Sequence, residues 1–171
     1  MNFGASFKCP AISGGVLVAA AQRMTVDPSE FNDITRRILA GAIEVHRTLG
    51  PGLLESIYTP CLHAELAARQ LRFVTQRSIQ IVYKGMPLES SYRVDLIVEG
   101  LVVVELKSTS ALLPVHQAQV LTYLEITKCP AGLLINFNVP RLMDGVKRLI
   151  NPRATRRRGE PERAEADRAE P

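Results

Sequence analysis

The stretch Ser91–Ser108 contains two apolar runs, and three of its five charged residues have no evident structural need there. Asp95 stands inside its first apolar run, and Glu105 and Lys107 follow the run Leu101–Val104. Strands rich in valine and isoleucine are normally covered on both faces, and an unpaired carboxylate is costly to bury there. We therefore expect the two carboxylates and the ammonium group to gather at a cation site.

The turn at Glu99–Gly100 decides whether these charged side chains share one face. Side chains alternate along a strand, so the second carboxylate and the ammonium group point the same way. A two-residue loop would send Asp95 to the opposite face. A three-residue loop over residues 98–100 pairs Asp95 with Val103 and aligns all three groups. Such loops favour glycine in the left-handed conformation at their last position, which is Gly100, so we predict this loop.

The donor set predicted from this hairpin consists of Asp95, Glu105 and the backbone carbonyl of Leu106. An all-oxygen set suits Mg²⁺ or Mn²⁺. A metal there would polarise a phosphodiester and activate a bound water, while Lys107 would orient that water or offset developing negative charge. The alternative is a plain ion pair at a strand end, since D…E-x-K is short enough to recur by chance.

Further motifs flank the hairpin. GLLESIY (residues 52–58) precedes it, and HQAQVLTY (residues 116–123) follows it. Together with D…ELK (residues 95–107) and GLLINFNVP (residues 132–140), they resemble the GxxExxY family of the PD-(D/E)XK nuclease superfamily. The resemblance runs over about residues 32–150, and several motifs in this order are specific.

What the resemblance implies is a restriction-endonuclease-like core in which Asp95, Glu105 and Lys107 form the metal and catalytic set. One departure is Val94, which stands where the superfamily motif has proline. The departure costs little, because the following carboxylate carries the chemistry.

The resemblance also implies that Glu55, at the start of a helix, is a further acidic residue and metal ligand. It implies that Gln119 and Tyr123 form a helical QxxxY element beside the site. Without it, Glu55 is a carboxylate that stabilises a helix N-terminus. Gln119 and Tyr123 share a helix face, and read alone they are a solvated glutamine beside a half-buried tyrosine. His116, on the same helix, is a further candidate for a phosphate or water contact.

Composition narrows the class of protein. A chain of 171 residues, 46% hydrophobic and 22% charged, is ordinary for a globular domain with a sizeable core. Cys9, Cys61 and Cys129 form no C-x-x-C pair, which argues against a disulfide framework or a zinc site and suits the reducing cytoplasm. The net charge of +4 is spread over the chain, so it gives no argument for nucleic-acid binding.

Three segments are expected. Residues 1–24 are predicted to be an extended or disordered arm in preference to a secretory signal, residues 25–151 a nuclease-like domain, and residues 152–171 a disordered charged tail. No run is long enough to span a membrane.

The predicted fold class is α/β: a restriction-endonuclease-like core with a central mixed β-sheet flanked by α-helices, in the order α-α-β-β-β-β-α-β-α. Periodicity, caps and turn residues predict these elements. They are a helix ending at Gly50, a helix over about 54–70 with a kink or late start at Pro60, strands over 72–82 and 87–92, the central hairpin, a helix over 114–127, a buried strand over 132–137 and a closing helix over 140–150.

The leading hypothesis is a metal-dependent nuclease that uses Mg²⁺ or Mn²⁺, with DNA favoured over RNA. The alternative is a non-catalytic nucleic-acid-binding or protein-assembly module that keeps the nuclease fold. A third reading is a partner protein whose interface is the rim at Leu112–Pro114. A homodimer would suit the cutting of two strands, although the sequence does not show one, and no membrane is expected as a partner.

Overall fold

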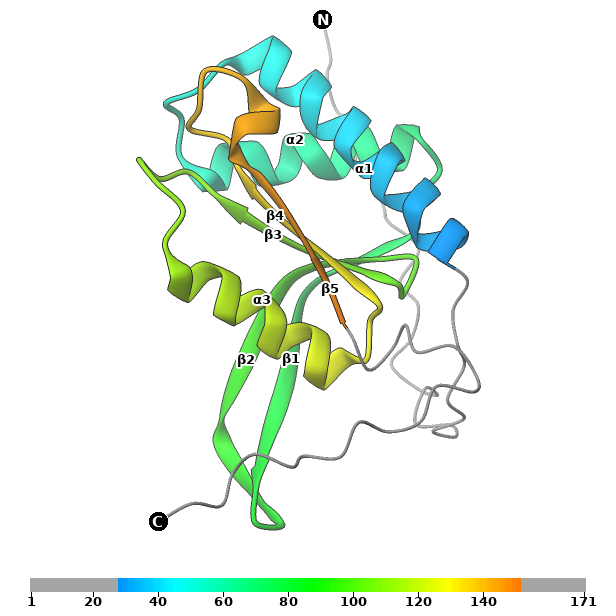
Figure 1. The fold of residues 1–171 in the computed structure, drawn as a ribbon, viewed down its shortest axis with the longest axis vertical. Coiled ribbons are helices and arrows are strands. Elements are labelled where there is room, and N and C mark those ends of the chain that lie inside the picture. The colour runs from blue at the N-terminus through cyan, green and yellow to red at the C-terminus, as the bar shows by residue number, and fades with distance from the viewer. Residues whose placement is uncertain (1–27, 152–171) are drawn as a thin grey trace, which may run out of the picture.

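The computed structural model describes residues 28–151 (Figure 1). The arm and the tail predicted for residues 1–24 and 152–171 lie outside this range. The elements, in chain order, are α1 (Pro28–Leu49), α2 (Glu55–Ala68), β1 (Phe73–Tyr83), β2 (Met86–Val98), β3 (Val102–Lys107), α3 (Pro114–Thr127), β4 (Ala131–Asn136), the 3-10 helix η1 (Leu142–Gly145) and β5 (Val146–Ile150).

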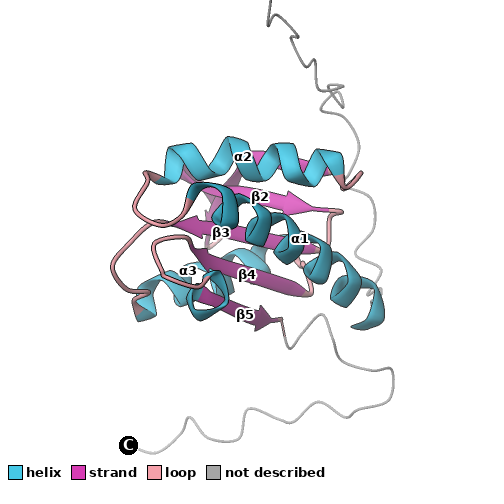
Figure 2. Cartoon of the chain, turned by 90° about the horizontal axis from the view of Figure 1, so that it is seen from above, coloured by secondary structure: helices cyan, strands magenta, loops and turns pink. Residues whose placement is uncertain are grey.

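The strands of the described chain form one sheet in the order β1-β2-β3-β4-β5. Neighbouring strands are antiparallel, except that β3 and β4 are parallel and are joined through α3. A parallel pair needs such a crossover connection. Helices α1 and α3 lie on opposite sides of the sheet (Figure 2). The predicted α/β class, a mixed sheet flanked by helices that is consistent with a restriction-endonuclease-like core, is therefore confirmed.

The central strand β3 is covered on both faces. Val102, Val104 and Leu106 belong to the core beneath α1 and α2, whereas Val103 packs with residues of α3. This double burial explains why the strand is a continuous apolar run instead of an alternating one. Among the described residues, no helix has the length and apolar character needed to cross a membrane.

Three details of the predicted element order are wrong. Strand β2 is continuous where two strands were expected. Helix α2 begins at Glu55 and runs through Pro60, so it has no late start. Residues 140–150 form η1 and β5 instead of a helix. Leu142, Val146 and Leu149 stand four and three residues apart, a spacing that imitates a helix, but Val146–Ile150 pairs with β4.

The predicted register of the central hairpin is also wrong. Val98 pairs with Val102, so the loop consists of the three residues 99–101 and lies one position further along the chain than expected. Because the change moves the pairing by two residues on β3, it brings Asp95 level with Glu105 instead of Val103. The two carboxylates are therefore closer neighbours than the sequence indicated.

Arg72 explains where the loop forms. Its backbone N–H donates to Glu99 Oε1 at 2.8 Å, and its guanidinium Nε donates to Glu99 Oε2 at 2.9 Å. Glu99 also donates its own N–H to the Arg72 carbonyl at 2.9 Å and takes φ = 52°. Gly100 has φ = 69°, the left-handed conformation that was predicted for it. This contact, 27 residues apart in sequence, fixes the loop at Glu99.

Gly132 on β4 gives a test of how closely α3 packs on the sheet. A Cβ at this position would lie 2.6 Å from Val120 Cγ1, so Gly132→Ala is expected to destabilise the protein by about 1–3 kcal/mol through overpacking. Chemical denaturation measures the free energy of unfolding. The control is Gly41→Ala in α1, where the nearest atom is 3.3 Å away and alanine favours the helix. Equal stability of Gly132→Ala and the wild type would contradict the close packing of α3.

Candidate functional site

Asp95 lies where β2 leaves β3. The pairing of β2 with β3 ends at Leu96, which is opposite Val104. In the pairing of β2 with β1, Val94 and Leu96 each have a partner, but Asp95 between them has none. Gln76 stands at the skipped position of β1 and has φ = 48°, outside the extended conformation of a strand. The sheet is therefore interrupted on both sides of the Asp95 backbone.

The Asp95 carboxylate contacts β3 past the point where the ladder ends. Leu106 donates its backbone N–H to Asp95 Oδ2 at 3.2 Å. In a strand, the N–H and C=O of one residue point toward the same edge. The Leu106 carbonyl therefore faces the same opening as the Asp95 carboxylate.

Glu105 is buried at the same end of β3, with 2% of its surface exposed. Lys107 Nζ donates to its Oε1 at 2.7 Å, while Oε2 is buried without a hydrogen-bond partner among the described residues. Burial raises the pKa of Glu105 to about 7; the hydrogen bond from Lys107 opposes this shift and the charge of Asp95 adds to it. A buried carboxylate oxygen without a partner is costly, and a cation or a proton would relieve that cost.

Lys107 remains charged in this setting. Burial by itself would lower the pKa of the ammonium group. The hydrogen bond to Glu105 and the negative charges of Glu105, Glu55 and Asp95 outweigh burial and raise it. The site therefore holds one fixed positive charge among three carboxylates.

Glu55 begins α2, on the opposite side of the opening from α3. Burial raises the pKa of its carboxyl group, the charge of Lys107 opposes the shift, and that of Asp95 adds to it. Glu55 therefore lies within electrostatic reach of both Lys107 and Asp95. A carboxylate in the first turn is also favourable for the helix itself.

Tyr58 builds the loop that leads into Glu55. Its hydroxyl donates to the Gly50 carbonyl at 2.6 Å and accepts the Leu53 N–H at 3.1 Å, and its ring stacks on Phe137. Ser108, the residue after Lys107, donates its hydroxyl to the Leu53 carbonyl at 2.5 Å. The start of α2 is thus tied directly to the end of β3.

The QxxxY pair on α3 supports the strand that carries Asp95. Gln119 Nε2 donates to the Tyr123 hydroxyl at 2.6 Å, and that hydroxyl donates to the Arg93 carbonyl at 3.1 Å. Burial raises the pKa of Tyr123, so the hydroxyl keeps its proton for this bond. Tyr123 therefore fixes β2 two residues before Asp95.

Asn136 was not among the residues predicted from the sequence. It is buried at the end of β4, where it pairs with Lys107 of β3. Its side-chain Oδ1 accepts a hydrogen bond from the Thr109 N–H at 3.0 Å, and its Nδ2 donates to the Thr109 carbonyl at 2.8 Å. Asn136 therefore anchors the loop that follows Lys107. A polar amide ending a continuous apolar strand was the signal that could have identified it.

Two histidines lie within electrostatic reach of the acidic residues. His63 on α2 packs against Phe73, and its Nε2 is buried without a partner in the described chain. Burial lowers the pKa of His63, and the charge of Asp95 opposes this. His116 accepts the Leu113 N–H through Nδ1 at 3.2 Å, which caps α3, and its ring lies within electrostatic reach of Glu55.

The fit of this site to a metal ion rests on the Asp95–Glu105 pair. No group of three or more His, Cys, Asp or Glu side chains within residues 28–151 is close enough together to hold an ion. The pair and the Leu106 carbonyl together present oxygen donors, which suit Mg²⁺ or Mn²⁺. The partnerless Glu105 Oε2 is the atom that such an ion would satisfy.

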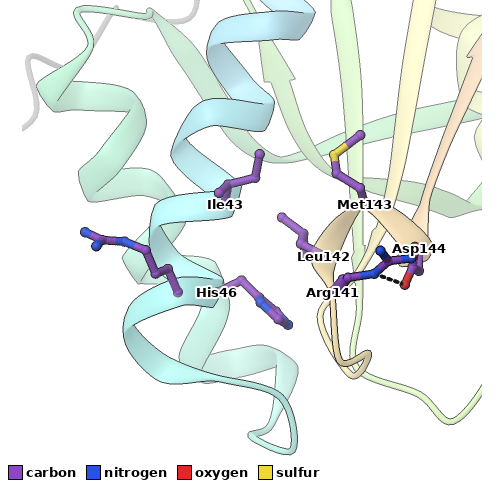
Figure 3. Close-up of a pocket in the computed structure, with 7 residues that line it drawn as sticks. Ile43, His46, Arg141, Leu142, Met143 and Asp144 are labelled. Carbon is purple, nitrogen blue, oxygen red and sulfur yellow. Dashed lines mark hydrogen bonds and ion pairs between the residues drawn. The ribbon is translucent and has the colours of Figure 1, made fainter.

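A shallow pocket lies away from these residues, between α1 and η1 (Figure 3). Ile43 and His46 line it from α1, and Leu142 and Met143 face them from η1. His46 Nε2 is 2.8 Å from the Val139 carbonyl, a contact that ties α1 to the loop before η1. The acid of the pocket, Asp144, pairs with Arg141, and the pocket lacks the carboxylate pair of the β3 site.

A family model described as the PD-(D/E)XK nuclease superfamily matches residues 32–149. No curated protein and no solved structure gives a significant match. The match spans every residue of the site, from Glu55 to Asn136.

The raised pKa of Glu105 predicts how stability depends on pH. The pKa of Glu105 is near 4.5 in the unfolded chain and about 7 in the folded protein, so the folded protein favours the protonated carboxyl group. This contribution to stability is complete below pH 4.5 and is lost as the pH rises through 7. In EDTA, Glu105→Gln should gain stability over the wild type by on the order of 3 kcal/mol between pH 4.5 and 8. Urea denaturation across this range measures the difference.

The surface variant Glu125→Gln is the control for this measurement. Its side chain is 43% exposed and pairs with Lys128, so its stability should follow the wild type across the pH range. If the Glu105→Gln and wild-type profiles ran parallel, the protonation of buried Glu105 near neutral pH would be refuted.

Proposed function

The chain belongs to the PD-(D/E)XK nuclease superfamily, and on this basis we propose that it is a metal-dependent nuclease. It hydrolyses phosphodiester bonds, and DNA is favoured over RNA as its substrate. The observation that supports this most directly is the buried Glu105 carboxylate, whose Oε1 is paired with Lys107 and whose Oε2 has no partner in the described chain. A purely structural ion pair would have no need to leave that oxygen unsatisfied.

Asp95, Glu105 and the Leu106 carbonyl are the groups that would hold Mg²⁺ or Mn²⁺. When bound, such an ion polarises the phosphodiester and lowers the pKa of a coordinated water. Glu55 adds negative charge from the start of α2, outside the close Asp95–Glu105 pair. Nucleases of this superfamily generally use divalent metals, which agrees with the donor chemistry.

The remaining residues act on the reacting groups or on their position. Lys107 keeps its proton, so its ammonium group can orient the attacking water and offset negative charge at the phosphate. Tyr123 and Gln119 are positioning residues, because they hold the Arg93 carbonyl and through it the backbone that leads to Asp95. The loop bonds of Tyr58 and Ser108 hold Glu55 in the same way.

The non-catalytic module is less well supported than an enzyme. A domain that only binds could replace Glu105 by an apolar residue and avoid the cost of burying a carboxylate. Here the acidic pair and the lysine are all present. The loops before α2 and after β3 are held by hydrogen bonds from Ser108 and Asn136.

A cleavage assay tests the proposal. The full chain would be incubated with labelled linear, single-stranded and branched DNA and with RNA, in Mg²⁺, Mn²⁺ or EDTA. Asp95→Asn removes a metal ligand and Lys107→Ala removes the ammonium group, so each should lower the cleavage rate by about a hundredfold or more. Calorimetry should show weaker Mg²⁺ binding by Asp95→Asn.

Asp144→Asn is the matched control for Asp95→Asn. Asp144 lies on η1 beside the distant pocket, so its variant should cleave at the wild-type rate. Absence of cleavage with every substrate and metal, together with unchanged Mg²⁺ binding by Asp95→Asn, would refute the nuclease proposal and favour the non-catalytic binding module.

A further inference from the structure

Strands β1 and β2 continue past the site as a two-stranded ribbon. Its pairs include Ser78 with Arg93 and Ile79 with Tyr92, and it closes in a turn at Lys84–Gly85. In Figure 1 it extends past α3, at the end of the molecule away from α1 and α2. We call residues 77–93 the β-ribbon. Since it leads directly into Asp95, whatever binds it lies next to the site.

The two faces of the β-ribbon differ in what covers them. Ile79 packs at the edge of the core beneath α3, and the Tyr92 ring meets a tyrosine of α3 edge-on at 5.7 Å. Paired residues share a face and successive residues alternate. Ser78, Gln80 and Arg93 therefore point to the opposite face, and all three side chains are exposed. That face is polar and carries donors suited to phosphate oxygens.

The β-ribbon holds the excess positive charge of the described chain. It contains three basic residues, Arg77, Lys84 and Arg93, and one acidic residue. The other residues of the range 28–151 comprise ten basic and ten acidic residues, so their formal charge is zero. Lys84 stands at the tip, with its ammonium 5.5 Å from the exposed ring of Tyr83. The charge therefore favours a polyanion on this ribbon and not on the rest of the described surface.

We propose that the polar face of the β-ribbon binds the phosphate backbone of a nucleic-acid duplex beside the scissile phosphodiester. Arg93 contacts a phosphate next to the site, and Lys84 contacts one near the far end of the ribbon. This inference rests on the proposed nuclease function and adds how the substrate is held and that it is double-stranded.

The dimensions of the β-ribbon suit a duplex. From Asp95 to the tip at Met86 an extended strand spans about 30 Å, which approaches one turn of B-form DNA, about 34 Å. A two-stranded ribbon is also narrow enough for the major groove, about 12 Å wide. Arg93 precedes Asp95 by two residues, about 7 Å along the strand, so its contact and the cleavage site would lie on adjacent phosphates.

Binding without cleavage separates this inference from the nuclease proposal. Fluorescence anisotropy in EDTA would measure the affinity of the full chain for a labelled linear DNA duplex and for the single strand, between about 50 and 200 mM salt. Lys84→Ala and Arg93→Ala should each weaken duplex binding by about fivefold to tenfold at 0.1 M salt, and lower the slope of log K against log salt by about one. The Arg93 substitution leaves the backbone carbonyl that bonds Tyr123.

Lys147→Ala and Arg36→Ala are the matched controls. Both residues are exposed outside the β-ribbon, Lys147 on β5 and Arg36 on α1, so neither should change the affinity or the salt slope. Circular dichroism would check that all four variants fold.

The outcomes distinguish the two proposals. Metal-dependent cleavage by the wild type, with affinity and salt slope unchanged in both ribbon variants, would overturn the ribbon inference and leave the nuclease proposal standing. A second result would also overturn it: if the wild type were a dimer, the ribbon variants were monomers and duplex binding were unchanged, the ribbon would be a self-association surface. Tighter binding of the single strand than of the duplex would overturn the double-stranded assignment. Failure of the wild type to bind or cut any nucleic acid would refute both proposals.

Discussion

The burial of the Glu105 carboxylate in the apolar strand β3 is the constraint on which the rest of the site depends. A carboxylate that is 2% exposed loses its hydration, and only one of its oxygens has a hydrogen-bond partner among the described residues. Lys107 supplies that partner two residues further along the same strand face. Because Lys107 is itself mostly buried, the pair is stable only where the strand ends and the sheet opens, which is where β2 leaves β3.

The interruption of the sheet has two consequences that reinforce each other. It removes the neighbour strand that would otherwise cover the end of β3, and it frees the Leu106 N–H to bond the Asp95 carboxylate. The opening is then held by contacts from three directions. Tyr58 and Ser108 fix the start of α2, Tyr123 fixes β2 from α3, and Asn136 fixes the loop after β3. Such long-range contacts define a site more rigidly than loops alone could.

The local pattern of this sequence was sufficient to predict the charged trio and most helices, but not the strand register. α3 spans Pro114–Thr127 as expected, because proline at its start and the apolar spacing are local signals. The predicted position of the hairpin loop was wrong because Glu99 is held by Arg72, 27 residues away. The local sequence of a turn does not reveal a partner that is so distant in the chain. The strand β5 was taken for a helix because Val146 and Leu149 have helical spacing, whereas pairing with β4 decided the outcome. Asn136 was overlooked for a similar reason, since its role depends on Thr109, which only the fold brings near it.

In the proposed metal site, a cation and a proton would compete for the same buried carboxylate. With a pKa of about 7, Glu105 carries a proton in a large fraction of molecules near neutral pH, and a cation can bind only after that proton leaves. Lys107 shifts this balance, because its ammonium group favours the charged carboxylate but also repels an incoming cation. In the proposed site, a divalent ion would gain the charges of both Asp95 and Glu105, an attraction that the single charge of Lys107 would not outweigh. Before an ion binds, partial protonation of Glu105 and the charge of Lys107 lower the negative charge of the site, and the second oxygen of Glu105 is the atom that the proposed ion would bind.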